Sequence, residues 1–412
     1  APVSFADYLM ALGILCGALT TLPVCAIVWM LTRRIAETAL AGAVFAVATP
    51  VTLRSAFHVV RYESLGILLV LALAAVLYRW RASAPLPARL ARILLFAAFA
   101  IGLAGAGIWR LFPLLAALLL MAATVADAVA PRTHPSILRP ALAAACGCLA
   151  AWPIFVFYPL AGAAGLPPLL APLAAAAAGW LIRQERVSGR LARRSRASRW
   201  ALTVTGLCLI LAGIGAATEA GLTWLRPILG MTPALHSHPS PPVLVGEMLP
   251  VDPATFFSWH YLGYLPVLYA AWLLYAARRA DVRQSDAFPA VAAWLAVGVT
   301  LLFNRMVFLG LPLVLIHLVG GITRLDAVRL RRFAGLNLRT AALGAMLPLL
   351  IGFAIQSRAS LAMLAQPPTD RRDTYQWVSA QTVPGTFLAA NWSLGYELQW
   401  YTPAITVMDG FL

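Results

Sequence analysis

The chain has 412 residues, of which 61% are hydrophobic and only 11% are charged. Soluble domains carry about 25% charged residues, so this composition excludes a water-soluble globular protein. The formal net charge is +16, and all 31 basic residues are arginines. Because these arginines are spread over short segments between apolar runs, and not gathered on one soluble face, the charge does not indicate a nucleic acid partner.

Apolar runs along most of the chain predict an all-α polytopic membrane domain. A helix needs about 20 apolar residues to cross roughly 30 Å of hydrocarbon. We expect about 12 transmembrane helices, at residues 8–31, 36–52, 64–78, 92–108, 111–127, 139–157, 164–182, 200–217, 258–277, 287–303, 305–323 and 341–357. The seventh run contains prolines, which a membrane helix tolerates where its neighbours satisfy the freed carbonyls.

The arginines between the spans predict which ends face the cytoplasm. Alternate connections hold 23 of the 31 arginines, and the positive-inside rule assigns that set to the cytoplasmic side. The other side receives residues 53–63, a tight turn at 109–110, a long loop at 218–257 and everything after 358. It also receives nine of the 15 acids. We therefore expect a multi-pass protein of a bacterial-type inner (cytoplasmic) membrane, with its chemistry on the extracytoplasmic face.

The pattern changes near residue 358, which divides the chain into two predicted parts. Residues 1–357 form the membrane domain with the outer loop 218–257. In residues 358–412 polar side chains return, and the pattern predicts a helix at 371–381 and strands at 386–390 and 404–408. We interpret this segment as the beginning of an extracytoplasmic soluble α/β domain, and the chain, which starts Ala-Pro without Met, as a fragment of a longer protein.

Glu63 is a candidate functional residue because it opens the third span on the outer side. An ionisable group at a membrane boundary is costly unless it is hydrated or paired, and it is a functional candidate by default. The structural alternative is an interfacial carboxylate paired with Arg61 or Arg54.

Three more segments of the predicted outer face carry candidate residues. Glu247 is a lone acid in an apolar, proline-flanked part of the long loop, where a packed carboxylate would require a cation. Arg305 lies at the mouth of the eleventh span and suits bidentate capture of a phosphate or carboxylate, although a snorkelling interfacial arginine fits as well. In the tail, aromatic residues cluster around the turn at 391–396, as in a peptide- or sugar-binding wall or in the core of a small domain.

Taken together, these segments resemble the catalytic subunit of oligosaccharyltransferase, the membrane enzyme that transfers a lipid-linked glycan to Asn. The family has an Arg-Ser stretch ending in paired acids at the start of an outer-face span, which residues 53–66 resemble here. Its loop glutamate, followed by Pro and aromatics, resembles Glu247 and residues 253–257, and its membrane arginine resembles Arg305. The tail resembles the run through the family's Trp-Trp-Asp-Tyr-Gly signature.

The resemblance implies a C-type membrane glycosyltransferase fold, a polyprenyl-linked sugar donor, a polypeptide acceptor and a Mn²⁺ or Mg²⁺ cofactor. Glu63 and Glu247 would be the catalytic residues and metal ligands, and Arg305 would bind the diphosphate. Trp392, Ser393 and Tyr396 would form the acceptor pocket. Hard oxygen ligands suit these cations, and charge develops on the diphosphate as its bond to the sugar breaks.

Two departures from the family pattern keep alternatives open. Arg61 stands in place of the first of the paired acids, and Ser393 replaces the carboxylate of the Trp-Trp-Asp signature. The first alternative keeps the fold and transfers the glycan to a lipid or glycan acceptor. The second is a non-enzymatic relative or transporter that has lost the metal site.

Overall fold

The computed structural model describes residues 14–48, 50, 52, 63–82, 86–109, 112–129, 137–153, 166–184, 253–259, 261–278, 287–302, 306–327, 338–365, 369–384, 386–390 and 405–408. Apolar helices dominate these residues. Five are long and apolar enough to cross a membrane: Ile14–Thr32, Ser64–Ala82, Ala88–Ile108, Val307–Leu325 and Leu338–Ala362. Six shorter apolar helices accompany them. The protein is therefore helical and membrane-embedded, as its composition predicts.

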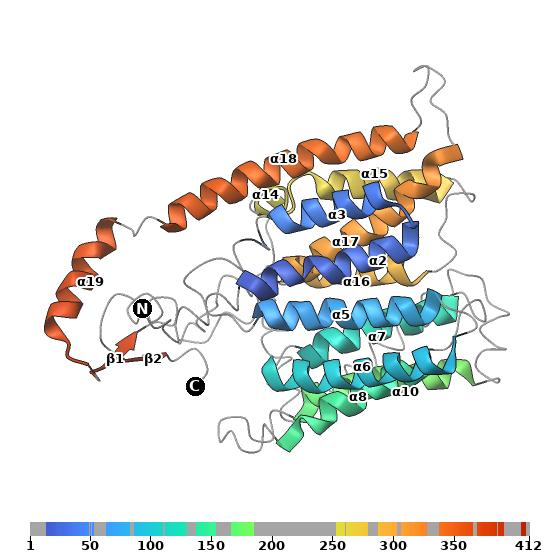
Figure 1. Cartoon of the computed structure of the whole chain (residues 1–412), viewed down its shortest axis with the longest axis horizontal. Helices are drawn as coiled ribbons and strands as arrows, with labels where there is room; N and C mark the ends of the chain where they lie inside the picture. The colour runs from blue at the N-terminus through green and yellow to red at the C-terminus, as the bar shows by residue number, and fades with distance from the viewer. Residues whose placement is uncertain are drawn as a thin grey trace, which may run out of the picture.

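The helices lie side by side as a bundle (Figure 1). In chain order they are α2 (Thr21–Thr32), α3 (Ile35–Val47), α5 (Glu63–Ala82), α6 (Ala88–Ile108), α7 (Phe112–Val129), α8 (Leu138–Ala150), α10 (Leu166–Arg183), α14 (Pro253–Phe256), α15 (Leu265–Arg278), α16 (Phe288–Leu302), α17 (Val307–Ile322), the 3₁₀ helix η5 (Thr323–Ala327) and α18 (Leu338–Ala365). Eleven of the twelve predicted spans coincide with helices of this set. The eighth, 200–217, lies outside the described residues.

The bundle has two ends, the Glu63 end and the arginine-rich end. At the Glu63 end, α5, α7, α15 and α17 begin and α3, α6 and α16 end; it lies on the left in Figure 1. At the arginine-rich end, the chain passes from α2 to α3, from α5 to α6 and from α17 into η5. The sequence predicts that the Glu63 end is extracytoplasmic and the arginine-rich end cytoplasmic.

Helix α17 is the centre of the bundle. Every residue from Val307 to Ile322 is buried, whereas most of the bundle's other helices also have exposed residues. A helix that is apolar all round belongs inside a bundle, and α17 packs against α2, α3, α15, α16 and α18. The residues that precede and follow α17 are therefore held at the two ends of the core.

Small residues permit close packing between α6 and α8. A Cβ at Gly102 would lie less than 3.0 Å from the Ala144 carbonyl oxygen, and one at Gly147 equally near the Phe99 carbonyl oxygen. Glycine at both positions lets the two backbones touch, as is common between membrane helices.

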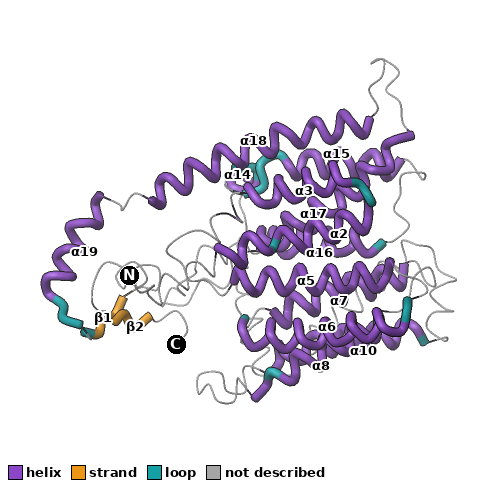
Figure 2. Tube along the Cα trace, in the orientation of Figure 1, coloured by secondary structure: helices purple, strands orange, loops and turns teal. Residues whose placement is uncertain are grey.

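Helix α18 runs the length of the bundle and continues past its Glu63 end (Figure 1). There the chain forms α19 (Thr369–Gln381) and two strands, β1 (Phe387–Ala390) and β2 (Ile405–Met408). The strands pair in parallel, with Phe387 opposite Ile405 and Ala390 opposite Met408. Figure 2 shows the strands beside α19, away from the helical bundle. These elements match the helix and strands predicted for the tail; the soluble α/β domain to which we assign them stays a prediction.

Candidate functional site

Glu63 is the first residue of α5, at the Glu63 end of the bundle. Its side chain lies outside the described part of the chain, but the turn that carries it is well defined by packing. Ser64 is buried, and a Cβ at Gly66 would lie less than 3.0 Å from two carbons of the Trp109 ring. The start of α5 therefore rests directly on this tryptophan.

The same tryptophan reaches the start of α17. Its ring centroid lies 5.9 Å from that of Phe308, in the first turn of α17. Met306 and Val307, which precede Phe308 in the sequence, are also buried. Arg305, the residue before Met306, lies outside the described residues. Trp109 thus joins the helix that begins with Glu63 to the helix that follows Arg305, so the structure brings these two predicted segments to one end of the bundle.

Hydrogen bonds link the end of α16 to the start of α17 at this end of the bundle. The Thr300 hydroxyl donates to the Met306 carbonyl oxygen at 3.1 Å, and the Tyr261 hydroxyl donates to the Thr300 carbonyl oxygen at 3.5 Å. A Cβ at Gly310 would collide with Thr300, so α16 and α17 are also in close contact. The segment that follows the long loop is therefore bonded to the last turn of α16, at the Glu63 end.

An aromatic cluster anchors that same chain segment to α18. Trp259 meets Phe353 edge-on at 5.8 Å between centroids and Tyr264 at 5.6 Å. The Tyr264 hydroxyl donates to the Ala345 carbonyl oxygen at 2.7 Å. Gly263 adopts a φ of +54° between these aromatics, a left-handed conformation that glycine adopts without strain. The start of the predicted ninth span, just after the outer loop, is thus packed against α18.

The remaining predicted site residues lie outside the described residues: Glu247, Arg305, Trp392, Ser393 and Tyr396. Within the described ranges no group of three or more His, Cys, Asp or Glu side chains lies close enough to hold a metal ion. The carboxylates of the predicted ligands Glu63 and Glu247 are hard oxygen donors of the kind that Mn²⁺ and Mg²⁺ prefer.

The arginine-rich end contains a buried ion pair that the sequence analysis did not single out. Arg81 of α5 donates from Nη1 to Asp127 Oδ1 of α7 at 2.5 Å, with 2% of Arg81 and 8% of Asp127 exposed. The Arg81 guanidinium also lies 5.8 Å from the centre of the Phe288 ring on α16. A lone acid inside an apolar run is the sequence signal for such a pair.

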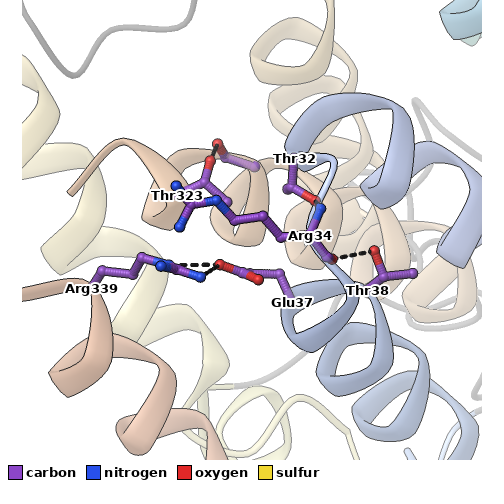
Figure 3. Close-up of polar contacts among 7 residues, drawn as sticks. Thr32, Arg34, Glu37, Thr38, Thr323 and Arg339 are labelled. Atoms are coloured by element: carbon purple, nitrogen blue, oxygen red, sulfur yellow. Dashed lines mark hydrogen bonds and ion pairs between the residues drawn. The ribbon is translucent and has the colours of Figure 1, made fainter. Parts of the chain in front are cut away.

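A second ion pair joins helices from the two ends of the chain (Figure 3). Arg339 of α18 donates from Nε to Glu37 Oε1 of α3 at 2.6 Å, and its Nη2 pairs with the same oxygen. Glu37 is completely buried. Figure 3 also shows the Arg34 side chain extending toward Thr323. Both ion pairs therefore fasten the arginine-rich end, opposite to the candidate site.

A buried tyrosine–histidine pair joins α15 to α17 inside the bundle. The Tyr269 hydroxyl lies 2.8 Å from His317 Nδ1, and both side chains are buried. This satisfies the mid-span histidine within the core, as expected for a structural residue.

The comparison with solved structures identifies the architecture. The archaeal oligosaccharyltransferase AglB from Archaeoglobus fulgidus, in complex with an inhibitory peptide and a dolichol-phosphate, matches with a TM-score of 0.66 and 16% sequence identity, over 98% of this chain and 53% of AglB. The fold is that of an oligosaccharyltransferase. The chain spans about half the length of AglB.

Two further structures of the Archaeoglobus fulgidus oligosaccharyltransferase match over the same share of this chain. One is tethered to an acceptor peptide containing the NVT sequon (TM-score 0.63, 16% identity, 53% of that chain), and one is in complex with Zn and sulfate (TM-score 0.62, 14% identity, 51% of that chain). No family model matches the sequence, and no curated protein sequence shows significant similarity to it. The likeness is therefore one of fold.

Proposed function

We propose that this chain is the membrane part of a glycosyltransferase that transfers a glycan from a polyprenyl-(di)phosphate donor to an acceptor at the Glu63 end. The observation that carries the proposal is the packing of the α5 and α17 starts around Trp109, in a bundle with an oligosaccharyltransferase fold. This packing supports the view that the Glu63 segment and the Arg305 segment meet at one end of the bundle. Transfer from a diphosphate requires a carboxylate and a cation to lie close together in this way.

In this proposal Arg305 binds the diphosphate of the donor. As the bond between sugar and phosphate breaks, negative charge grows on the leaving diphosphate, and a preorganised guanidinium stabilises it. Arg305 lies in the sequence between α16 and the core helix α17, and the hydrogen bond from Thr300 to Met306 links these two helices. We expect this support to place the guanidinium before the reaction begins.

Glu63 and Glu247 are proposed to contact the acceptor and to hold Mn²⁺ or Mg²⁺. A bound divalent ion would supply a Lewis acid near the diphosphate oxygens. The contacts of Trp259 and Tyr264 with α18 support placing Glu247 near this end, because Glu247 lies only six residues before α14. The carboxylates themselves would orient the acceptor nucleophile by accepting its hydrogen bonds.

The acceptor is a polypeptide in the first version of the proposal, with Trp392, Ser393 and Tyr396 in its binding pocket. The AglB structures with inhibitory and acceptor peptides support this version. Ser393, in place of the family's carboxylate, favours a second version with a lipid or glycan acceptor, because a neutral hydroxyl binds a sequon hydroxyl more weakly than a charged group does. The proposed setting for both versions is a bacterial-type inner membrane, with the Glu63 end outside.

The test is a transfer assay in membranes that contain the full-length protein. A labelled polyprenyl-diphosphate glycan is supplied with Mn²⁺ and either sequon peptides or lipid acceptors, and product is counted per folded protein. We expect Glu247→Gln to lower transfer by about 100-fold or more, the loss typical of removing one preorganised catalytic group. Glu219→Gln, which changes another acid of the same predicted loop, is the matched control and should leave transfer within about threefold.

The outcomes separate the alternatives. Product on sequon peptides supports the first version, and product on lipid acceptors alone supports the second. Transfer that survives Glu247→Gln contradicts the assigned site. Absence of product with every acceptor overturns the enzyme proposal and favours a non-enzymatic relative.

A further inference from the structure

The buried side chain of Trp109 contacts both helices that carry the proposed site: Gly66 of α5 and Phe308 of α17. We propose that Trp109 is a positioning residue, which sets the separation between the start of α5 and the start of α17 and so the distance from Glu63 to Arg305. The inference rests on the proposed function. It concerns a residue in the turn between α6 and α7, whose side chain acts through the two helix starts.

Trp109 is placed by its backbone as well as by its ring. It caps the end of α6 in an extended conformation, donating its N–H to the Gly105 carbonyl oxygen at 2.9 Å. Its own carbonyl oxygen accepts from the Phe112 N–H at 2.9 Å. These two hydrogen bonds fix the backbone of Trp109 at the end of α6 and before α7. A fixed backbone limits how far the ring can move, as a rigid spacer requires.

The direction in which Trp109 points distinguishes it from an ordinary membrane tryptophan. Tryptophans at the ends of membrane helices are enriched at the lipid–water interface, where the ring contacts lipid and water. Trp109 is only 3% exposed and turns into the bundle, between Gly66 and Phe308. An anchoring role in the interface therefore does not explain its position.

The close contact between Trp109 and Gly66 of α5 determines how strongly a substitution at Gly66 should slow the reaction. A Cβ at residue 66 would lie less than 3.0 Å from two carbons of the Trp109 ring, so an alanine there forces the ring or the helix start to move by about 1 Å. A misplacement of about 1 Å between reacting groups costs about 100-fold in rate. A methyl group at Gly66, which touches no substrate, should therefore slow the reaction strongly.

The bundle offers a matched control at its other end. A Cβ at Gly321 of α17 would lie less than 3.0 Å from three carbons of the Trp272 ring on α15, and Trp272 is 6% exposed. The residue types, the burial and the tightness are the same as at Gly66 and Trp109. The control contact lies at the arginine-rich end, away from the proposed site.

The experiment measures kcat and the KM for the lipid-linked donor, per folded full-length protein, for two parallel sets of variants. In the first set, Gly66→Ala should lower kcat by about 100-fold and Trp109→Phe by about tenfold, with the donor KM changed less than threefold. Combining them should recover at least tenfold of the loss in Gly66→Ala, because the smaller phenyl ring leaves room for the methyl group.

In the control set, Gly321→Ala, Trp272→Phe and their combination should change kcat less than threefold, even where the folded yield falls. If Gly66→Ala gives no folded protein, the comparison of Trp109→Phe with Trp272→Phe decides. Equal kcat losses in both sets, or an unchanged kcat in the first set, would overturn the positioning role while leaving the proposed function intact. A wild-type protein without transfer activity would overturn both.

Discussion

Breaking the ion pair between Arg81 and Asp127 should strongly lower the stability of the bundle. Arg81 is 2% exposed and Asp127 8%, so neither charge can regain water when its partner is removed. Breaking a buried pair by neutralising one partner costs about 3–5 kcal/mol. Since every 1.4 kcal/mol is a factor of ten, Asp127→Asn should lower the folding equilibrium constant by about 100-fold to a few thousand-fold.

Replacing both partners tests whether this cost comes from the charge left behind. A buried ion pair exchanged for apolar residues of similar volume is often neutral or stabilising. We therefore expect Arg81→Met combined with Asp127→Leu to lie within about 2 kcal/mol of the wild-type protein, well above the Asp127→Asn single variant. The lost stacking of the Arg81 guanidinium on Phe288, 5.8 Å from the ring centre, would account for about 0.5–2 kcal/mol of any remaining difference.

The assay is equilibrium unfolding in mixed detergent micelles, followed by helical circular dichroism as the denaturing detergent fraction rises. Glu37→Gln is the control, because its partner Arg339 is 21% exposed and can partly regain water when the carboxylate is lost. We expect that variant to be less destabilised than Asp127→Asn. If the double apolar variant is less stable than Asp127→Asn, the reasoning is refuted, because that result would mean that the ion pair itself supplies net stability.

Three further results are expected. Gly102→Ala should destabilise the bundle by about 1–3 kcal/mol, because the new methyl group meets the α8 backbone. Gly298→Ala, with open space around it, should be neutral or stabilise α16 by up to about 1 kcal/mol in the same unfolding assay. Tyr269→Phe should cost about 1 kcal/mol through the hydrogen bond it loses to the α17 histidine, and an unchanged midpoint would contradict that role. In a cysteine-free background, a membrane-impermeant maleimide should label Val383→Cys in intact cells and Arg33→Cys only after permeabilisation; the reverse pattern would show that the predicted orientation is wrong.

The helices could be predicted from the sequence because continuous apolar runs decide where a chain crosses a membrane. Eleven expected spans coincide with helices, and the helix and strands of the tail lie within two residues of their expected limits. The partners inside the bundle could not be predicted in the same way. Arg81 and Asp127 are 46 residues apart, and Glu37 and Arg339 are 302 apart, and nothing in the spacing of charges says which acid meets which arginine.

The candidate site was only partly accessible to sequence reasoning. The outward position of Glu63 and Arg305 follows from the order of spans, and the packing of α5 and α17 at one end of the bundle agrees with it. The turn at 109–110 was also expected, but a turn predicts nothing about which way its tryptophan points. That depends on Gly66, 43 positions earlier, where the missing side chain makes room for the ring.

Helix α18 has a consequence for the tail that follows from its length and from its contacts with the bundle. Its 28 residues make a rod of about 42 Å, longer than the roughly 30 Å of hydrocarbon, and only 17% of its apolar window is buried. Pro348 lies inside it and cannot donate a hydrogen bond to the carbonyl of Gly344 one turn earlier. Beyond this proline, Phe353 packs against Trp259 and the Ser357 hydroxyl donates to the Val47 carbonyl oxygen, so α18 is fastened to the bundle on both sides of the interruption. The fastened helix carries α19 and the paired strands past the Glu63 end (Figure 1).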